Sequence, residues 1–196
     1  LSTAFSGVVD ENDLCFLGEA TQEKLSDVLG MWVEETDALF DEEANETSWN
    51  QNTYKLKEIC EVIHTTTAEV LAVYGKDYYK GAPVITKNTY GVGTAYHIAA
   101  NCEDALIEDL CRQLVAEAQI TGILGDADIP DGIGICYREN ETKRYIFIGN
   151  FSDEAKCIDF SKSSGNEERA YVNILDDAKI GGKVCLEPYG IVILES

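Results

Sequence analysis

The stretch PVITKNTYGVGTAYHIAAN, residues 83–101, decides how the first part of the chain folds. β-Branched and aromatic residues on both sides of Tyr90-Gly91-Val92-Gly93 predict two strands joined by a turn, because glycine tolerates the positive φ that such a turn requires. Gly91 and Gly93 are also a weak signal for a phosphate-binding loop. That alternative lacks a third glycine and lies between two strands instead of between a strand and a helix, so a hairpin is the better interpretation.

An amphipathic helix is predicted directly after this hairpin, in NCEDALIEDLCRQLVAEAQ, residues 101–119. Asn101 is the expected N-cap, and Asp104 follows three residues later, as in a capping box. A stripe of apolar residues of this kind packs against a sheet. The residues that recur every four positions are Leu106, Leu110, Leu114 and Ala118, and the stripe is widened by Ile107, Cys111 and Val115.

The residues before the hairpin predict a mixed α/β arrangement. Residues 21–30 fit a short helix that Thr21 caps and Gly30 ends. Residues 42–52 indicate a polar connection. Strands are expected over residues 1–9, 31–40, 58–66 and 68–75, and the last two are plausible partners of each other.

The sequence pattern changes after Gly122. Residues 123–132 hold the Gly, Asp and Pro residues typical of a linker. Six short β-rich runs follow, separated by turn residues, and they predict a small antiparallel sandwich or barrel. We therefore predict two domains, residues 1–122 and residues 123–196, with a boundary near residues 122–130. The six runs are IGICY, RYIFIGN, AKCIDF, AYVNIL, KVCLE and YGIVILE.

Composition indicates a folded and strongly acidic protein. The chain has 196 residues, 45% of them hydrophobic, which is enough to bury a core in one large or two small domains. It is shorter than the about 250 residues typical of a TIM barrel. A net charge of −21 argues against binding to nucleic acids or anionic membranes, because both attract clustered Lys and Arg. The acidic run at residues 34–46 is expected to be a solvated surface rather than a cation site.

The cysteines predict a reducing environment. Their number, seven, is odd, and no C-x-x-C occurs, so we expect small buried hydrophobic residues rather than a disulfide framework or a zinc site. No signal peptide or membrane span is predicted, which favours a cytoplasmic protein. The chain opens at Leu1 in what resembles a strand already under way, so we expect a fragment of a longer polypeptide. The cysteines are Cys15, Cys60, Cys102, Cys111, Cys136, Cys157 and Cys185.

Two groups of residues are candidates for chemistry. The acidic run Asp10–Asp13 fits a metal or acid–base site poorly, because Leu14 breaks the calcium-loop pattern and no basic residue occurs before Lys24. We expect a loop that caps turns or makes contacts. Cys60 and His64 would form a nucleophile–base pair in a helix, but in a strand they would lie about 13 Å apart. We therefore assign no catalytic, cofactor-binding or metal-binding residue.

Several segments carry a resemblance to a known family. SGVVDENDLCFLG, LSDVLGMWVEETDAL and AEVLAVYGKDYYKGAPVITKNTYGVGTAYHIA resemble, across most of residues 1–120, the trimerisation domain of bacterial β-galactosidases of glycoside hydrolase family 42. The tail, with RYIFIGNFSDEA and LEPYGIVIL, is similar to the small C-terminal β domain that follows it there. His97 stands where an aromatic residue is expected in the family.

The resemblance implies both a fold and a function. Residues 1–122 would be the C-terminal portion of an α/β trimerisation domain, flavodoxin-like and similar to class I amidotransferases, with its front missing. Residues 123–196 would be an all-β domain. The parent would be a cytoplasmic homotrimer whose N-terminal TIM barrel carries two catalytic glutamates and hydrolyses terminal non-reducing β-D-galactosides with retention. The chain would then be its non-catalytic oligomerisation and accessory part, without a cofactor.

Two other functions stay open at the level of sequence. One is a stand-alone amidotransferase-like α/β enzyme that uses Cys60 and His64. The other is a carbohydrate-binding module in which Trp32, Trp49 and the pair Tyr78–Tyr79 stack on sugar. Against the second, Trp32 is expected in the core and the two tyrosines at a domain seam.

Overall fold

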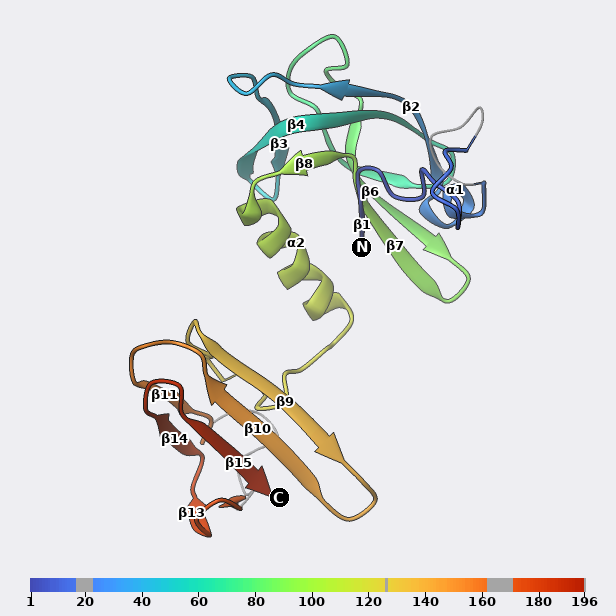
Figure 1. Ribbon diagram of the computed structural model, residues 1–196. Helices are drawn as coiled ribbons and strands as arrows, with labels where there is room; N and C mark the ends of the chain where they lie inside the picture. Colours follow the sequence, from blue (N-terminus) through green and yellow to red (C-terminus); the bar gives the residue numbers. More distant parts are fainter. Residues whose placement is uncertain (17–22, 126, 162–170, 196) are drawn as a thin grey trace. The chain divides into compact units, whose positions relative to one another are not determined.

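The computed structural model describes residues 1–16, 23–125, 127–161 and 171–195 (Figure 1). Contacts divide the chain into two compact units, which we call the N-terminal unit (Leu1–Gln113) and the C-terminal unit (Leu114–Ser196). The described residues form fifteen strands and two helices, so this part of the chain is mostly β. Each unit has its own sheets.

The first sheet of the N-terminal unit is built on the predicted hairpin. Its strand order is β1-β7-β6-β5, and all pairs are antiparallel except β1 with β7. Tyr90 pairs with Gly93 across a two-residue turn, and Gly91 has a φ of 59°, as a hairpin turn with glycine in its first central position requires. The hairpin prediction is confirmed. The strands are β1 (Ser2–Thr3), β5 (Glu69–Val73), β6 (Pro83–Tyr90) and β7 (Gly93–Ile98).

The second sheet is organised around β4, a strand of fourteen residues that pairs with β2, β3 and β8. The expected pairing of residues 58–66 with residues 68–75 is wrong, because β4 and β5 lie in different sheets. The polar connection expected at residues 42–52 is also wrong, because β3 lies there. The strands are β2 (Met31–Ala38), β3 (Asn45–Trp49), β4 (Asn52–Thr65) and β8 (Ala100–Cys102).

Helix α1 (Glu23–Leu29) confirms the first predicted helix. Gly30 follows it with a φ of 65°, and its N–H donates to the Ser26 carbonyl, as expected for a residue that ends a helix. A Cβ on Gly30 would lie 2.5 Å from the Thr67 hydroxyl oxygen, so this site needs glycine for space as well. The predicted cap, Thr21, lies outside the described residues.

Helix α2 (Asp104–Glu117) confirms the second predicted helix but not its cap. Asn101 lies in β8, and its side chain donates to Glu58 instead of capping the helix. Leu106 and Leu110 are fully buried, as the stripe predicts. Val115 is 46% exposed, so the buried stripe is shorter than its sequence pattern.

The expected flavodoxin-like α/β class is not confirmed by this structure. Parallel strands need long crossover connections, usually helical, to return the chain to the same edge. In the described part of the N-terminal unit, β1 and β7 form the single parallel pair, and the other strands meet antiparallel neighbours. Most of this unit is therefore antiparallel β structure.

The C-terminal unit is all β beyond α2, as predicted. Its main sheet has the order β13-β12-β15-β10-β9, and β11 pairs with β14 in a separate two-stranded ribbon. Each of the six predicted runs supplies one strand, and β13 was not expected. The strands are β9 (Ile133–Glu139), β10 (Arg144–Asn150), β11 (Lys156–Asp159), β12 (Tyr171–Asn173), β13 (Ala178–Ile180), β14 (Lys183–Leu186) and β15 (Ile191–Glu195).

One hydrophobic core joins the ribbon to one face of the main sheet, so this unit is a small two-layer sandwich. Burial alternates along β10 and β15, which gives each strand an inward and an outward set of side chains. The sheet contributes Ile146, Ile148, Tyr171, Val192 and Leu194, and the ribbon contributes Ile158, Phe160, Val184 and Leu186.

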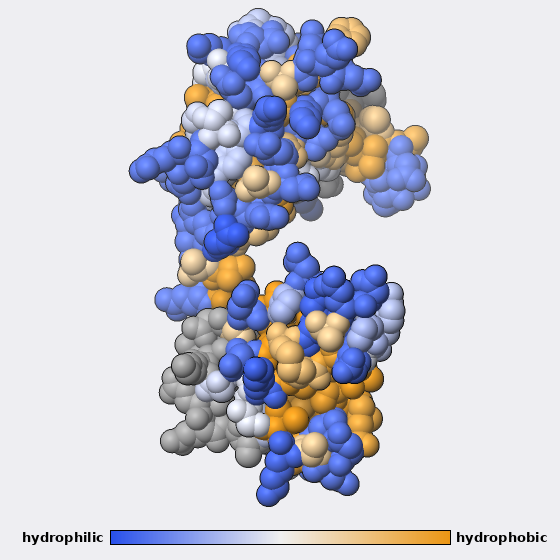
Figure 2. Space-filling model, turned by 90° about the vertical axis from the view of Figure 1, so that its left-hand side faces the viewer, coloured by the Kyte–Doolittle hydropathy of each residue, from blue (hydrophilic) through white to orange (hydrophobic). Residues whose placement is uncertain are grey.

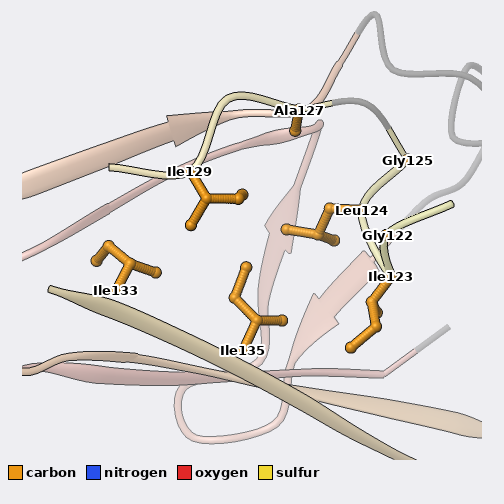
Figure 3. A pocket seen from close by; sticks show the side chains of 8 residues that line it. All are labelled: Gly122, Ile123, Leu124, Gly125, Ala127, Ile129, Ile133 and Ile135. Carbon is orange, nitrogen blue, oxygen red and sulfur yellow. The ribbon is translucent and has the colours of Figure 1, made fainter. Parts of the chain in front are cut away.

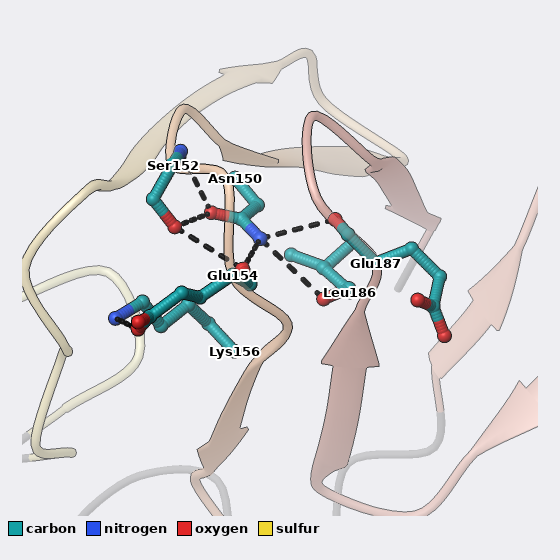
Figure 4. Close-up of polar contacts among 6 residues, drawn as sticks. All are labelled: Asn150, Ser152, Glu154, Lys156, Leu186 and Glu187. Carbon is teal, nitrogen blue, oxygen red and sulfur yellow. Dashed lines mark hydrogen bonds and ion pairs between the residues drawn. The ribbon is translucent and has the colours of Figure 1, made fainter.

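Asn150 fastens the end of β10 to the end of β14 (Figure 4). Its amide nitrogen donates to the carbonyls of Glu154 (2.7 Å) and Glu187 (3.0 Å), and its amide oxygen accepts the N–H and hydroxyl of Ser152. The side chain is 2% exposed, so these bonds satisfy an amide that would otherwise be costly to bury.

A disulfide joins Cys157 in β11 to Cys185 in β14. The prediction that no cysteines pair is therefore wrong for these two residues. They are directly opposed in the antiparallel register, with Cα atoms 4.1 Å apart, and this proximity is set by strand pairing across 28 residues of sequence. The other five cysteines are free.

A buried acid–histidine pair lies between the two sheets of the N-terminal unit. Glu61 of β4 and His97 of β7 are each 2% exposed, and their Oε2 and Nε2 atoms lie 3.5 Å apart. The second oxygen of Glu61 accepts the Phe5 N–H at 2.8 Å, and His97 Nδ1 contacts the Ser2 hydroxyl at 3.2 Å. The pair therefore holds the first residues of the chain against both sheets.

Reduction of the disulfide should destabilise the C-terminal unit. Opening a 28-residue loop releases conformational entropy in the unfolded chain, and a loss of about 3–4 kcal/mol is expected. Hydrogen exchange of β10 and β15 peptides, with and without a dithiol reductant, measures this change. Cys157→Ser should reproduce the effect, and Cys136→Ser should not. Equal exchange of reduced and oxidised protein would contradict the expectation.

The two histidines offer a matched comparison of buried and exposed pairs. His97→Ala should cost about 3–5 kcal/mol, because it removes a buried ring and leaves a cavity beside the Glu61 carboxyl group. His64→Ala should cost at most about 1 kcal/mol, because the His64–Glu34 pair is half exposed. Urea unfolding followed by tryptophan fluorescence reports on the N-terminal unit, which holds both tryptophans. Similar losses in both variants would show that burial of the pair is not decisive.

Candidate functional site

A cavity of about 220 Å³ lies in the C-terminal unit, between the residues after α2 and strand β9 (Figure 3). Its described lining is entirely aliphatic or glycine, and the side chains of Leu124, Ile129 and Ile135 point into it (Figure 3). Sugar sites need polar groups that fix the ligand hydroxyls. The described lining offers no polar side chain for that purpose. The lining residues are Gly122, Ile123, Leu124, Gly125, Ala127, Ile129, Ile133 and Ile135.

Cys60 and His64 do not form a reactive pair. Both lie in β4, as the strand interpretation predicts, but their side chains meet different partners. Cys60 is fully buried, and burial raises the pKa of its thiol, which disfavours the thiolate that a nucleophile requires. His64 is on the surface, where it stacks on Trp32 and pairs with Glu34. The geometry does not support an enzyme based on this pair.

The aromatic candidates for sugar stacking are divided between surface and core. Trp49 and Tyr79 are buried, at 7% and 5% exposure, so they cannot stack on a ligand in solution. Trp32 is 42% exposed, so its expected place in the core is wrong, but one face of its ring already lies on His64. Tyr78 is 69% exposed rather than packed in a seam. No shared sugar platform follows from these positions.

The two tyrosines instead bind acidic side chains of β2. Tyr78 donates its hydroxyl to Glu35, and this hydrogen bond raises the pKa of the phenol to about 12. Tyr79 donates to Asp37 at 2.9 Å, and burial raises its pKa. Both phenols therefore stay protonated at neutral pH. They act as hydrogen-bond donors that hold the loop after β5 to β2.

The acidic loop Asp10–Asp13 is a self-contained turn. One oxygen of the Asp10 carboxylate accepts the backbone N–H groups of Asn12 (2.8 Å) and Leu14 (3.0 Å). The Asp10 N–H donates to the Leu14 carbonyl, which closes the loop. Asp13 has a φ of 61°, a conformation that aspartate tolerates better than most residues. The expected capping role is confirmed for Asp10.

Among the residues that the structure describes, neither a metal centre nor a membrane-spanning helix is found. Within the described residues, no group of three His, Cys, Asp or Glu side chains is placed to hold a metal ion. No described helix is both long and apolar enough to cross a membrane.

The Glu61–His97 pair was not predicted from the sequence, because 36 residues separate its members and tertiary packing alone brings them together.

Removing the Asp10 carboxylate should loosen this loop. Asp10→Ala loses two hydrogen bonds to backbone amides at a partly exposed site, and a loss of about 1 kcal/mol is expected. Faster hydrogen exchange at Asn12 and Leu14 should accompany it. Asp13→Asn is the control, because asparagine keeps the left-handed backbone. Unchanged exchange in Asp10→Ala would refute the capping role.

Comparison with protein families gives two matches that follow each other along the chain. Residues 1–121 match the model described as the β-galactosidase trimerisation domain. Residues 132–196 match the model described as the β-galactosidase C-terminal domain. Both models belong to glycoside hydrolase family 42.

Individual relatives match almost the whole chain. The chain is 36% identical over 201 residues to β-galactosidase Pbg of Clostridium perfringens, and the match covers 99% of this chain. It is also 36% identical over 200 residues to β-galactosidase BglY of Alicyclobacillus acidocaldarius, covering 98% of this chain. The chain spans 28% of the length of each of these relatives.

Solved structures agree with these matches. The crystal structure of a β-galactosidase from Bacillus circulans sp. alkalophilus matches with a TM-score of 0.83 and 34% identity, over 98% of this chain and 28% of that one. Gan42B, a family 42 β-galactosidase, matches with a TM-score of 0.83 and 29% identity, over 99% of this chain and 27% of that one. The chain therefore belongs to the β-galactosidases of glycoside hydrolase family 42, of which it comprises trimerisation-domain and C-terminal-domain sequence.

Proposed function

We propose that the chain is the non-catalytic oligomerisation and accessory part of a β-galactosidase. The parent enzyme hydrolyses terminal non-reducing β-D-galactosides with retention, and its two catalytic glutamates lie in a TIM barrel outside these residues. The observation that carries the proposal is the pair of consecutive domain matches over nearly the whole chain, which spans only 28% of its relatives.

The site geometry supports a division of labour between this chain and the rest of the enzyme. A retaining glycosidase needs two carboxyl groups about 5 Å apart that flank a polar sugar pocket. The cavity in the C-terminal unit has an aliphatic described lining, and the Asp10 carboxylate is occupied by backbone amides. The cavity lining and the acidic loop therefore contribute to packing and loop structure instead of to catalysis.

We propose further that the parent assembles as a homotrimer through residues 1–122, and that residues 123–196 form a separate domain. The name of the matched family model, trimerisation domain, supports the first part. Strand β1 lies at the edge of its sheet and is parallel to β7, which fits a sheet that upstream residues extend into a flavodoxin-like α/β domain. Such an extension would cover the exposed edge of β1.

A cytoplasmic location is part of the same proposal. Five of the seven cysteines are free, which fits a reducing compartment. Cys157 and Cys185 are both exposed, so cellular dithiols would have access to their disulfide.

The purified chain should not hydrolyse o-nitrophenyl β-D-galactoside, and its full-length parent should. The parent's first product, followed by proton NMR, should be the β-anomer of galactose, because retention keeps the configuration. Hydrolysis by the chain alone would overturn the proposal, as would inversion by the parent.

Sedimentation velocity of the same two samples tests assembly, and a strictly monomeric parent would refute the homotrimer.

A further inference from the structure

The main sheet of the C-terminal unit is apolar on both faces. Antiparallel sheets that face water usually carry polar residues on the solvent side. Here the inward face packs on the ribbon, and the outward positions of β9, β10, β12 and β15 are still largely apolar. Figure 2 shows hydrophobic side chains gathered on the surface of this unit. The outward residues, which we call the outer face, are Cys136, Tyr145, Phe147, Val172, Ile191 and Ile193, together with Phe151 just after β10.

Two glycines shape one end of the outer face. Gly134 in β9 is paired with Gly149 in β10, so neither strand places a side chain there. The ring of Phe151 lies over both, because a Cβ built on Gly134 would be 2.7 Å from it and one on Gly149 would be 3.2 Å away. Phe151 nevertheless stays 75% exposed, next to Ile191 at 57%. An exposed aromatic ring held flat on the sheet is a preformed contact surface rather than a flexible one.

The other end of the outer face carries charge. Tyr145 is paired with Arg138 of β9 and with Glu195 of β15, and Glu195 binds Lys143 at 2.7 Å. The centre holds Phe147 between Cys136 and Ile193. An apolar centre with charged residues at its margin is the arrangement found in protein–protein interfaces.

The size of the outer face decides between possible occupants. Seven partly exposed side chains present on the order of a few hundred Å². A free dimer needs about 1,200–2,000 Å² in total, which is more than two such faces supply. Contacts between domains of one chain are smaller than those between free partners. Because a tether gives an effective concentration of roughly 1 mM, such a contact can form with a dissociation constant about 1,000-fold weaker than that of a micromolar complex.

We propose that the outer face is the docking surface for the preceding, catalytic part of the same β-galactosidase polypeptide. This inference rests on the proposed function, since it takes the occupant to be the part of the enzyme outside these 196 residues, which span 28% of the relatives. The β domain would then brace the catalytic part directly, in addition to the assembly that the trimerisation domain provides.

Cys136 is a suitable probe of this contact, because it is free and exposed and lies directly beside Phe147 on the edge strand β9. Its rate of alkylation by N-ethylmaleimide, resolved by peptide mass spectrometry, is compared between the 196-residue chain and the full-length parent. Cys136 should react about tenfold more slowly in the parent, because a contact occupied nine-tenths of the time leaves the thiol free for one tenth. In the chain alone it should react rapidly at every protein concentration.

A matched pair of variants locates the contact. In the parent, Phe151→Glu should restore rapid labelling of Cys136, because it places a charge in the contact. Phe40→Glu should not, although Phe40 is similarly exposed, at 79%, in the N-terminal unit. Ile191→Glu is a second variant on the outer face and should behave as Phe151→Glu does.

Each other result overturns the inference. Rapid labelling in an active parent means that the catalytic part does not cover this face, while the proposed function stands. Protection in the chain alone assigns the face to a second copy if it rises with protein concentration, and to the N-terminal unit if it does not. A parent that has no galactosidase activity, or no residues before Leu1, refutes the proposed function itself and removes the occupant.

Discussion

The N-terminal unit depends on the burial of part of β4, the central strand of its second sheet. Four consecutive residues of β4, Cys60 to Ile63, are buried, which requires cover on both faces of that strand. One of them is Glu61, whose Oε2 atom lies 3.5 Å from Nε2 of His97 in the other sheet. The Tyr74 hydroxyl donates to the carbonyls of Glu61 and Ala99 at the same junction. Hydrogen bonds placed inside the core thus fix how the two sheets meet, because buried polar groups without a partner are costly.

Local rules predicted the elements whose structure is decided locally. Gly91 and Gly30 mark a hairpin turn and a helix end because both backbones need a positive φ. Strand β3 was missed because its inward positions, Asn45 and Thr47, are polar. Their side chains are buried through hydrogen bonds to the carbonyls of Lys76 and Val73, which lie 26 or more residues away. The disulfide was also not predicted, because its two cysteines are distant in sequence and only the register of β11 and β14 brings Cys157 to Cys185. The apolar outer face had a signal in sequence, because both alternating sets of RYIFIGN and YGIVILE are rich in apolar residues.

The candidate sites show why this part of the enzyme is suited to packing rather than to bond cleavage. In its acidic loop, one oxygen of the Asp10 carboxylate accepts two backbone N–H groups of the same loop. Burial raises the pKa of the Cys60 thiol. Its cavity has an aliphatic described lining. Polar groups in the described residues are largely engaged in holding elements together, as with Asn150 and with Tyr79. A catalytic centre requires polar groups that converge on a ligand. The family matches supply the context in which a packing module of this kind is useful.

Covalent trapping of the parent enzyme tests the central claim most directly. A retaining galactosidase forms a glycosyl–enzyme intermediate on its nucleophilic carboxylate, and a 2-deoxy-2-fluoro-galactoside with a good leaving group accumulates it. Peptide mass mapping of the trapped parent then locates the labelled residue. If these 196 residues serve assembly and support, the adduct lies in a peptide outside them. An adduct on any carboxylate between Leu1 and Ser196 would contradict that account.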